Sequence, residues 1–390
     1  MIPYSRQSIQ PSDIEAVTNV LTSPWLTQGP MVPQLEDGLT KTLRVDYAVG
    51  CSSGTAALQL AYSSLGVDSS SLGIVPAVTF AATANAFRNL GAKVIFCDVN
   101  GDDGIISLDS LERCLEEVRE NHEFNKGVIS PVSLAGKTAP LEEIFHLAQK
   151  YEFKVVEDAS HSPGAYFLDD KGNKDYSASC KWTDAATVSF HPVKHICCGE
   201  GGALLTNSEE MARKAELLRS HGISRDTDQS KNRPWYYEQV ELGWNFRLTD
   251  IHAALGFEQL KRLPESLARR HSIAERYAQF LSDEEFTNWI DLPEVKHGHA
   301  LHLYVIRFKQ PQHRDQAYHF LKERKIMTQV HYIPLYRHPY HKAEYEPVDF
   351  PGTEAYFQHC LSIPMHAALT KVDQDRVVEA LAEFLPDNGL

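Results

Sequence analysis

The sequence predicts an α/β fold with a mixed, mostly parallel central sheet, helices on both faces of that sheet, and a smaller C-terminal α+β domain. Three observations support this. Apolar strand-like runs alternate with helical runs between residues 46 and 208, which is typical of parallel sheets. A long helical stretch follows at 249–281, and strands and helices alternate again after residue 300. We place the boundary near residue 260, giving a large domain over 1–260 and a small domain over 261–390.

The large domain should open with two helices. A proline and acidic residues introduce the amphipathic run 11–23, so a helix should begin near Pro11. A proline-rich loop then leads into a second helix within 24–39. The units expected after it are a strand, a small-residue turn and a helix at 46–66 and again at 72–91, a strand at 92–100, a strand and loop at 126–140, a helix at 141–152, a strand ending in acids at 153–165, and two strands at 185–192 and 201–208.

The second half of the chain is expected to be helical first and mixed afterwards. The stretch 249–281 should break at Pro264, because proline disrupts a helix interior. Beyond it the sequence predicts a strand at 301–308, a helix around 314–324 and a strand at 326–334. In the large domain, residues 167–182 are expected to form an exposed excursion between sheet strands.

Charge and cysteine content narrow the class of protein. The chain has 390 residues and a net charge of -14, which makes it a poor candidate for electrostatic binding of nucleic acid. No apolar run approaches the roughly 18 residues of a membrane span. Seven cysteines without a repeated C-x-x-C spacing indicate reduced thiols. We therefore expect a cytoplasmic enzyme that binds neither nucleic acid nor a membrane.

Polar residues should gather at the carboxyl ends of the strands, where open α/β sheets bind their ligands. Small residues at 52–55 precede a helix, whose free N–H groups and dipole suit a phosphate. An ordinary helix cap is the alternative. Asp158 ends a buried-looking strand, where a carboxylate needs a cationic or hydrogen-bonding partner. A protonated pyridine nitrogen would serve, and a structural salt bridge is the alternative.

A lysine and an aromatic ring complete the candidate site. Lys194 lies in a tight turn between two strands. An amine held near apolar or cationic groups has a depressed pKa and becomes nucleophilic, although most lysines are solvated. Ser189 could donate to the same phosphate as Thr55, and Phe80 could either stack on a flat heteroaromatic ring or belong to the core. Together these groups match the needs of pyridoxal 5′-phosphate (PLP).

Two other kinds of site are not expected. A cluster of His191, His195, Cys197 and Cys198 lacks the ligand spacing of a zinc site, and adjacent cysteines in a strand would point to opposite faces. The sequence therefore predicts no metal. The run GEGG at 199–202 lacks the G-x-G-x-x-G order of a dinucleotide site.

With these residues assembled, the chain resembles the PLP-dependent fold-type I sugar aminotransferases of the DegT-like family. The resemblance covers nearly the whole length, through LTQGP, SSGTAAL, PAVTFAATANA, VVEDASHSPGA, SFHPVKHICCGEGGAL, RSHGI, GWNFRLTDIHAALGFEQL, VHYIPLY and LSIPMH. Within the family, PYSRQSI, SFHPVKHI and QVHYIPLYRHPYH are most similar to the transaminases of pseudaminic-acid biosynthesis. Those enzymes aminate C4 of a UDP-linked 4-keto-6-deoxy-N-acetylhexosamine.

The resemblance implies roles in cofactor binding. Lys194 would form the internal aldimine, and Asp158 would pair with the pyridine nitrogen. Both would be catalytic. The phosphate would be held by Gly54, Thr55 and Ser189. The remaining cofactor contacts would be Phe80 and Ala159 on the two ring faces, His161 near the phenolic oxygen, and Asn245 at the cofactor phosphate of the neighbouring subunit.

The resemblance also implies the substrates and the assembly. The amino donor would be glutamate, and the acceptor a UDP-keto-sugar. A homodimer would share its active sites through Asn245. The positions that match sugar-nucleotide contacts are Tyr4, Pro24, Trp25, Leu26, Thr27, Gly54, Ser189, Asn245, Gln329, Val330, His331 and Tyr332.

Some features leave alternatives open. Cys197 and Cys198 stand where many relatives have two threonines, and thiols hydrogen-bond more weakly than hydroxyls. The stereochemistry of the sugar at C5 and the amino donor stay open. The chain could instead aminate a different nucleotide-linked keto sugar, or act as a catalytically silent regulator that binds PLP or a sugar nucleotide. Lys194 favours transamination over the dehydration run by relatives with histidine there.

Overall fold

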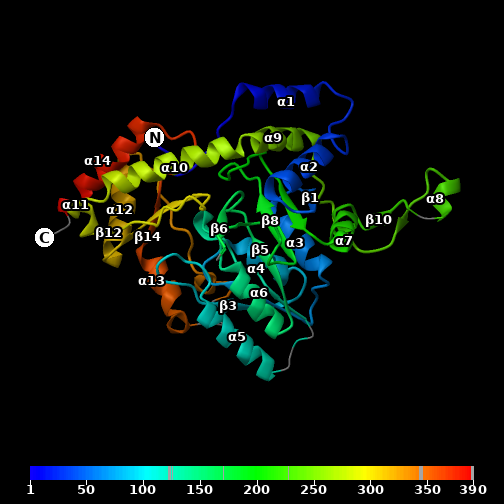
Figure 1. Ribbon diagram of the computed structural model, residues 1–390, viewed down its shortest axis with the longest axis horizontal. Helices are drawn as coiled ribbons and strands as arrows, with labels where there is room; N and C mark the ends of the chain where they lie inside the picture. The colour runs from blue at the N-terminus through cyan, green and yellow to red at the C-terminus, as the bar shows by residue number, and fades with distance from the viewer. Residues whose placement is uncertain (122–123, 125, 170, 227, 342–345, 388–390) are drawn as a thin grey trace.

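The protein is described by a computed structural model that covers residues 1–121, 124, 126–169, 171–226, 228–341 and 346–387. Its centre is a seven-stranded sheet with helices packed around it (Figure 1). In spatial order the strands are β1 (Tyr47–Cys51), β9 (Gly202–Thr206), β8 (Ala185–Ser189), β5 (Phe153–Asp158), β4 (Lys126–Ile129), β2 (Ser71–Pro76) and β3 (Lys93–Cys97).

The sheet is mostly parallel, as predicted. β2 pairs in parallel with β3 and β4, β4 with β5, and β5 with β8. The sheet departs from this pattern only at the edge formed by β1 and β9, because β9 runs antiparallel to both β1 and β8. The carboxyl ends of the parallel strands therefore meet at one side of the molecule, where ligands of such sheets bind.

Helices cover both faces of the sheet, and residues along a strand alternate between the two cores. In β8, Ala185 packs with one set of helices and Ala186 with the other. The first face carries α3 (Gly54–Ser64), α4 (Ala81–Arg88) and α7 (Glu209–Arg219). The second face carries α2 (Met31–Leu43), α5 (Leu108–Asn121), α6 (Leu141–Lys150) and α9 (Asp250–Lys261), and α1 (Pro11–Leu21) packs on α9.

Local sequence explains where several helices begin. α1 begins at Pro11, where a proline costs no hydrogen bond. Ser53, Ser208 and Thr249 cap α3, α7 and α9, and each side chain accepts a hydrogen bond from a backbone N–H of the first turn. These caps fix the positions of the loops that precede the helices.

The C-terminal part forms a second core around a three-stranded antiparallel sheet. Its strands are β12 (Ile290–Asp291), β13 (Tyr304–Phe308) and β14 (Cys360–Ile363). Ile2 packs in this core and pairs with Ile326, so the first residues of the chain lie beside its last third. The predicted boundary near residue 260 falls at the end of α9, just before α10, and remains a prediction. The helices of this part are α10 (Leu263–Phe280), α11 (Glu284–Thr287), α12 (Pro311–Glu323), α13 (Pro351–His359) and α14 (Lys371–Asp387).

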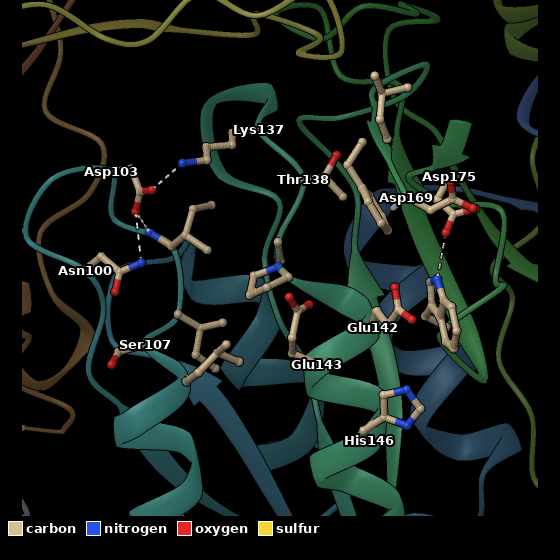
Figure 2. A pocket seen from close by; sticks show the side chains of 18 of the residues that line it. Asn100, Asp103, Ser107, Lys137, Thr138, Glu142, Glu143, His146, Asp169 and Asp175 are labelled. Atoms are coloured by element: carbon tan, nitrogen blue, oxygen red, sulfur yellow. Dashed lines mark hydrogen bonds and ion pairs between the residues drawn. The ribbon is translucent and has the colours of Figure 1, made fainter. Parts of the chain in front are cut away.

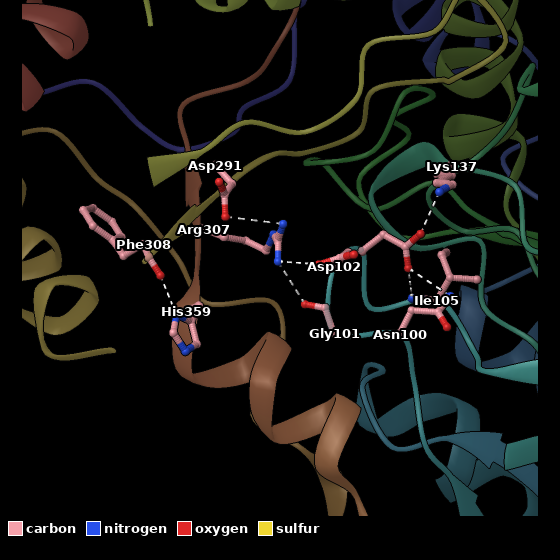
Figure 3. A network of polar contacts seen from close by, with 10 residues as sticks. Asn100, Gly101, Asp102, Ile105, Lys137, Asp291, Arg307, Phe308 and His359 are labelled. Atoms are coloured by element: carbon pink, nitrogen blue, oxygen red, sulfur yellow. Dashed lines mark hydrogen bonds and ion pairs between the residues drawn. The ribbon is translucent and has the colours of Figure 1, made fainter. Parts of the chain in front are cut away.

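Arg307 of β13 joins the two sheets. Its Nη1 donates to the carbonyl of Gly101 at 3.4 Å and to the carboxylate of Asp102 at 2.7 Å, in the loop after β3 (Figure 3). Its Nη2 lies 3.6 Å from the carboxylate of Asp291 in β12. The contact positions the small sheet against the loops at the carboxyl edge of the large one.

Two expectations in the C-terminal half need correction. The stretch 326–334 is not a strand, because only Ile326 and Gln329 form isolated bridges, to Ile2 and Ser362. Of its apolar residues, Val330 and Ile333 line a cavity at the carboxyl edge of the large sheet, and Ile326 packs in the C-terminal core. The helical stretch does break, but at Arg262; Pro264 lies in the first turn of α10, where proline is tolerated.

The excursion 167–182 is only partly exposed. It contains a hairpin of β6 (Tyr166–Leu168) and β7 (Lys174–Tyr176). The carboxylate of buried Glu157 accepts hydrogen bonds from the hydroxyl of Ser177 at 2.6 Å and the backbone N–H of Ala178 at 2.8 Å. These bonds draw the end of the excursion into the core, a long-range contact that no local pattern predicts.

A thin arm extends from the body of the molecule after α7. It carries β10 (Ile223–Ser224), α8 (Asp228–Asn232) and β11 (Glu238–Gln239), and Figure 1 shows it reaching well away from the sheet. Trp235, Tyr237 and Leu242 on this arm are exposed. Within the described residues, every helix is too short or too polar to cross a membrane.

Candidate active site

A cavity of about 730 Å³ opens at the carboxyl edge of the sheet. The loops after β1, β2, β5 and β8 line it, together with the segment 329–333 and Tyr4. This arrangement follows from the parallel strands, whose ends meet there. Of the residues predicted for the site, the cavity brings together Tyr4, Gly54, Thr55, Phe80, Asp158, His161, Ser189, Lys194, Gln329, Val330, His331 and Tyr332.

The other predicted residues lie outside this cavity. Ala159 is fully buried behind Asp158, and Asn245 is exposed at the root of the arm. Pro24 and Trp25 line a separate cavity between α1 and α9. The last two predicted residues, Leu26 and Thr27, lie beside the start of α9. The carbonyl of Leu26 accepts a hydrogen bond from the N–H of Asp250, and Thr27 forms an isolated antiparallel β-bridge with Thr249.

Asp158 is held firmly at the end of β5. Its side chain is only 5% exposed. One carboxylate oxygen accepts from the hydroxyl of Thr83 at 2.8 Å, and the other accepts from the backbone N–H of Ser160 at 3.1 Å. A carboxylate fixed in this way can still accept a further hydrogen bond from a ligand, because each oxygen has two lone pairs.

Lys194 is partly buried and lies in the turn after β8. Its backbone N–H donates to the carbonyl of His191 at 2.8 Å, and the hydroxyl of Ser5 donates to the carbonyl of Val193 at 3.1 Å. Burial lowers the pKa of the Lys194 amine from 10.5 to about 8, although the negative charge of Asp158 acts in the opposite direction. The amine is therefore neutral in a substantial fraction of molecules near pH 8 and can act as a nucleophile or base.

Gly54 and Ser189 approach each other so closely that no larger side chain fits at residue 54. A Cβ added to Gly54 would lie 2.9 Å from the Cβ of Ser189. Thr55 follows in the first turn of α3, and this helix start points its N–H groups and the positive end of its dipole at the cavity. The arrangement is a cradle for a small anion such as a phosphate.

Neutral imidazoles form the back wall of the cavity. His161 Nδ1 accepts from the backbone N–H of Ala135 at 3.3 Å, so Nε2 carries the proton and donates to the hydroxyl of Tyr332 at 3.2 Å. The ring of His302 lies 4.2 Å from that of His161. Burial lowers the pKa of both rings well below 6.5, so neither adds positive charge to the site. The pKa of His331 falls to about 3 for the same reason.

Comparison with known proteins identifies the family. The model of the DegT/DnrJ/EryC1/StrS aminotransferase family matches residues 7–382. The chain belongs to this family. It is 35% identical over 387 residues to the UDP-4-amino-4,6-dideoxy-N-acetyl-beta-L-altrosamine transaminase of Campylobacter jejuni, covering 99% of this chain and 98% of the relative.

Solved structures agree with this assignment. The aminotransferase PseC of Helicobacter pylori, involved in the biosynthesis of pseudoaminic acid, superposes with a TM-score of 0.88 at 28% identity and 99% coverage of both chains. A sugar aminotransferase from Streptococcus pneumoniae in its PMP form gives a TM-score of 0.89 at 28% identity, covering 99% of this chain and 100% of that one. The predicted fold and aminotransferase class are confirmed.

The sequence did not single out two residues of this aminotransferase site. Thr83 orients Asp158 through its hydroxyl, and the ring of His302 packs against that of His161 at an interplanar angle of 30°. Thr83 lies one turn after Thr79, whose hydroxyl is 2.9 Å away, but threonines at this spacing are common in helices. His302 comes from the C-terminal part of the chain, so only the tertiary fold brings it to the cavity.

A larger cavity, of about 1030 Å³, lies elsewhere on the aminotransferase, between the loop after β3, the start of α6 and the hairpin β6–β7. Its lining is rich in carboxylates, and Lys137 is paired with Asp103 at 2.6 Å (Figure 2). No residue predicted for the site lines it. Size alone therefore does not identify the candidate active site.

The two cysteines that were considered and rejected as metal ligands are buried. Cys197 and Cys198 lie in the loop before β9, between the two predicted strands, and burial raises the pKa of both thiols. Over the part of the chain that the structure describes, no three His, Cys, Asp or Glu side chains are grouped to hold a metal ion.

Proposed function

We propose that this chain is a PLP-dependent aminotransferase that transfers an amino group from glutamate to C4 of a UDP-linked 4-keto-6-deoxy-N-acetylhexosamine, in the biosynthesis of pseudaminic-acid-type sugars. One observation carries the proposal: Lys194, Asp158 and an anion cradle share a single cavity. The sugar substrate is proposed from the Campylobacter jejuni relative, whose name gives an amino sugar of this kind.

The residues of the cavity fit PLP. The cradle of Gly54, Thr55 and Ser189 suits its phosphate, because the glycine lets the start of α3 approach Ser189 closely and both line the cavity. Phe80 is 61% exposed and projects into the cavity, where it can stack on a flat ring. His161 presents a neutral N–H near Tyr332, and this donor suits a phenolic oxygen.

The proposed chemistry assigns a task to each group. When bound, PLP supplies an aldehyde that exchanges amino groups and a protonated ring that accepts electrons. Asp158 would accept a hydrogen bond from the ring N–H and so keep that nitrogen protonated. The amine of Lys194 would bind the aldehyde and later move a proton between the substrate carbon and C4′ of the cofactor, as general base and acid. Because the donor's product leaves before the sugar enters, we expect ping-pong kinetics.

The segment 329–332 and Tyr4 would contact the sugar nucleotide. His331 is buried and its Nδ1 lies 2.8 Å from the hydroxyl of Ser362, so the ring is fixed. The rings of Tyr4 and His331 are 5.5 Å apart. Since the pKa of His331 is far below neutrality, this side of the site would recognise the sugar by shape and hydrogen bonds.

The substrate experiment uses both candidate C5 epimers of the UDP-4-keto sugar with glutamate as donor. We expect one epimer to be aminated and an equivalent amount of 2-oxoglutarate to appear. Amination of a different nucleotide sugar would redirect the proposal to that sugar. A protein that binds PLP but releases no 2-oxoglutarate with any of these sugars would instead be the silent regulator.

The proposed dimer would complete the site. Asn245 is exposed in one chain, and exposed apolar side chains lie both on the arm and on the loop with Trp25 and Leu26. Apolar surface of this kind is typical of an interface. We propose that Asn245 reaches the cofactor phosphate of a second copy.

We also propose a cytoplasmic location. All seven cysteines are free thiols, and free thiols are typical of a reducing compartment.

Mixing two inactive variants should test the shared site. If Asn245 of one subunit serves Lys194 of the other, a mixed dimer of Asn245→Ala and Lys194→Ala contains one intact site. Random exchange of subunits should restore about a quarter of the wild-type sites, by the statistics of a two-fold dimer. Absence of any recovery, with mixed dimers demonstrated by native mass spectrometry, would place Asn245 in its own subunit's site. Near-normal activity of Asn245→Ala alone would place it outside catalysis.

The pKa of Lys194 predicts the pH dependence of cofactor uptake. Only the neutral amine attacks an aldehyde, and burial shifts deprotonation from 10.5 down to about 8. Uptake of PLP by cofactor-free protein should therefore accelerate as pH rises, with a midpoint near 8. In Asp158→Asn the negative charge that favours the ammonium form is lost, so the midpoint should move to lower pH. A midpoint near 10, or an upward shift in the variant, would contradict the depressed pKa.

A further inference from the structure

A further cavity, of about 410 Å³, lies on another side of Lys194 and is called the rear cavity. Lys194 lines both this rear cavity and the candidate active site. The rear cavity is otherwise formed by the N-terminal segment around Arg6, by His195 and Cys197 after the lysine, and by the junction of α9 and α10. Its volume is within the range of small-molecule sites.

The rear cavity is strongly cationic. Four arginines line it against a single carboxylate, Glu265, among its described lining residues: Arg6, Arg262, Arg269 and Arg270. Lys194 adds a further positive charge only when its amine is protonated. Arg262 is already neutralised, because its Nη2 lies 2.7 Å from the buried carboxylate of Asp13. The remaining arginines have no carboxylate partner within the described part of the chain. In a protein with a net charge of -14 this local excess of positive charge is unusual.

Arg270 is the most informative of these residues. It is 2% exposed, and its Nη1 donates to three carbonyl oxygens, those of Leu301 at 3.0 Å, His302 at 3.1 Å and Met365 at 3.3 Å. Its other N–H groups have no partner among the described residues, and its Nε is fully buried. A buried guanidinium without an anion is costly, because it loses hydration and gains no opposite charge.

The neighbours of Arg270 add no negative charge. Burial keeps His195 neutral, and its Nε2 donates to the carbonyl of Ala300 at 2.8 Å. Arg269 is partly buried and donates to the carbonyl of Leu369 at 2.6 Å. Arg6 is exposed at the cavity mouth. Positive charge therefore extends from the surface at Arg6 to the buried Arg270.

We propose that the rear cavity binds a small dicarboxylate, with one carboxylate on Arg270 and the other toward Arg6. Two separated arginines favour two carboxylates over one, since each guanidinium can pair with a carboxylate. Such a ligand would place negative charge behind the amine of Lys194. The proposal rests on residues other than those assigned to the cofactor and does not depend on the proposed function.

Calorimetric titration of the full chain with succinate, in a chloride-poor buffer, tests the proposal. We expect one site per chain, and acetate should bind at least about tenfold more weakly because it makes one charged contact. Arg6→Gln and Arg269→Gln should each weaken succinate binding by about tenfold, and Arg270→Gln should abolish it. Arg213→Gln is the matched control, since it removes an exposed arginine on α7 that lines neither cavity.

The variants distinguish succinate binding in the rear cavity from binding in the candidate active site. If Arg270→Gln fails to fold, Arg6→Gln and Arg269→Gln still decide, because both residues are at least partly exposed. Succinate binding that Thr55→Val weakens and the arginine variants leave unchanged would assign the anion to the candidate active site and overturn the proposal. Equal binding of acetate, or no succinate binding at millimolar concentration, would also overturn it. Loss of PLP binding or of transaminase activity in any arm would bear on the proposed function alone.

Discussion

Replacing Lys194 by alanine should reduce transamination by at least about 10⁴-fold, because the same amine binds the cofactor and moves the proton. Among the described residues that line the cavity, Lys194 is the only lysine. No neighbouring amine can therefore replace it. Initial rates of 2-oxoglutarate release, measured with saturating PLP, would quantify the loss.

Lys137→Ala is the control for this variant. Lys137 lines the larger carboxylate-rich cavity, where it is paired with Asp103, and it does not line the candidate active site. It should leave turnover unchanged. Borohydride reduction of the wild-type protein followed by peptide mapping should place the pyridoxyl mass on Lys194. Recovery of that mass on another lysine, or near-normal turnover of Lys194→Ala, would refute the assignment.

Asp158→Asn should lower kcat by about 10²-fold or more while some cofactor stays bound. Asparagine has almost the same shape as aspartate, and its oxygen can still accept the hydrogen bond from Thr83. It lacks the negative charge that would keep the ring nitrogen protonated. The loss should therefore appear in kcat, and a cofactor spectrum with a shifted absorbance maximum should accompany it. Turnover equal to that of the wild type would exclude the pyridinium role.

Glu157→Gln is a matched control, because Glu157 is the preceding carboxylate on the same strand. Its side chain is fully buried on the other face of the sheet and accepts from Ser133, Ser177 and Ala178. Replacing it should destabilise the protein by about 1–3 kcal/mol, the usual cost of disturbing buried charged hydrogen bonds. The melting temperature should fall, while the kcat of the folded protein should change little.

The sequence could predict that Asp158, Ser189 and Gly54 share one cavity, because topology alone brings those residues together. Asp158 and Ser189 end two parallel strands that are adjacent in the sheet, and the helix start at Gly54 faces them. Once alternation indicates a parallel sheet, residues at strand ends must converge. The order of the strands was not needed for this inference, only their common direction.

Other parts depend on contacts that no local pattern reveals. The stretch 326–334 has the alternation of a strand, yet it lines the cavity because β14 pairs with β13 and leaves it only isolated bridges. The end of the excursion 167–182 is buried because the carboxylate of Glu157 accepts hydrogen bonds from Ser177 and Ala178, just after the hairpin. Asn245 and the loop 24–27 lie outside the cavity in a single chain, and the role predicted for Asn245 would need a second copy.

The anchoring of the first residues has a consequence for biosynthesis on the ribosome. Ile2 pairs with Ile326, the carbonyl of Tyr4 accepts from the N–H of Met365, and Ser5 bonds the lysine turn. Residues 2–5 can therefore dock only after residues up to Met365 have left the ribosome. Until then the cavity lacks the wall that Tyr4 supplies, so we expect the nascent protein to gain a complete ligand pocket only after Met365 has been translated and released from the exit tunnel.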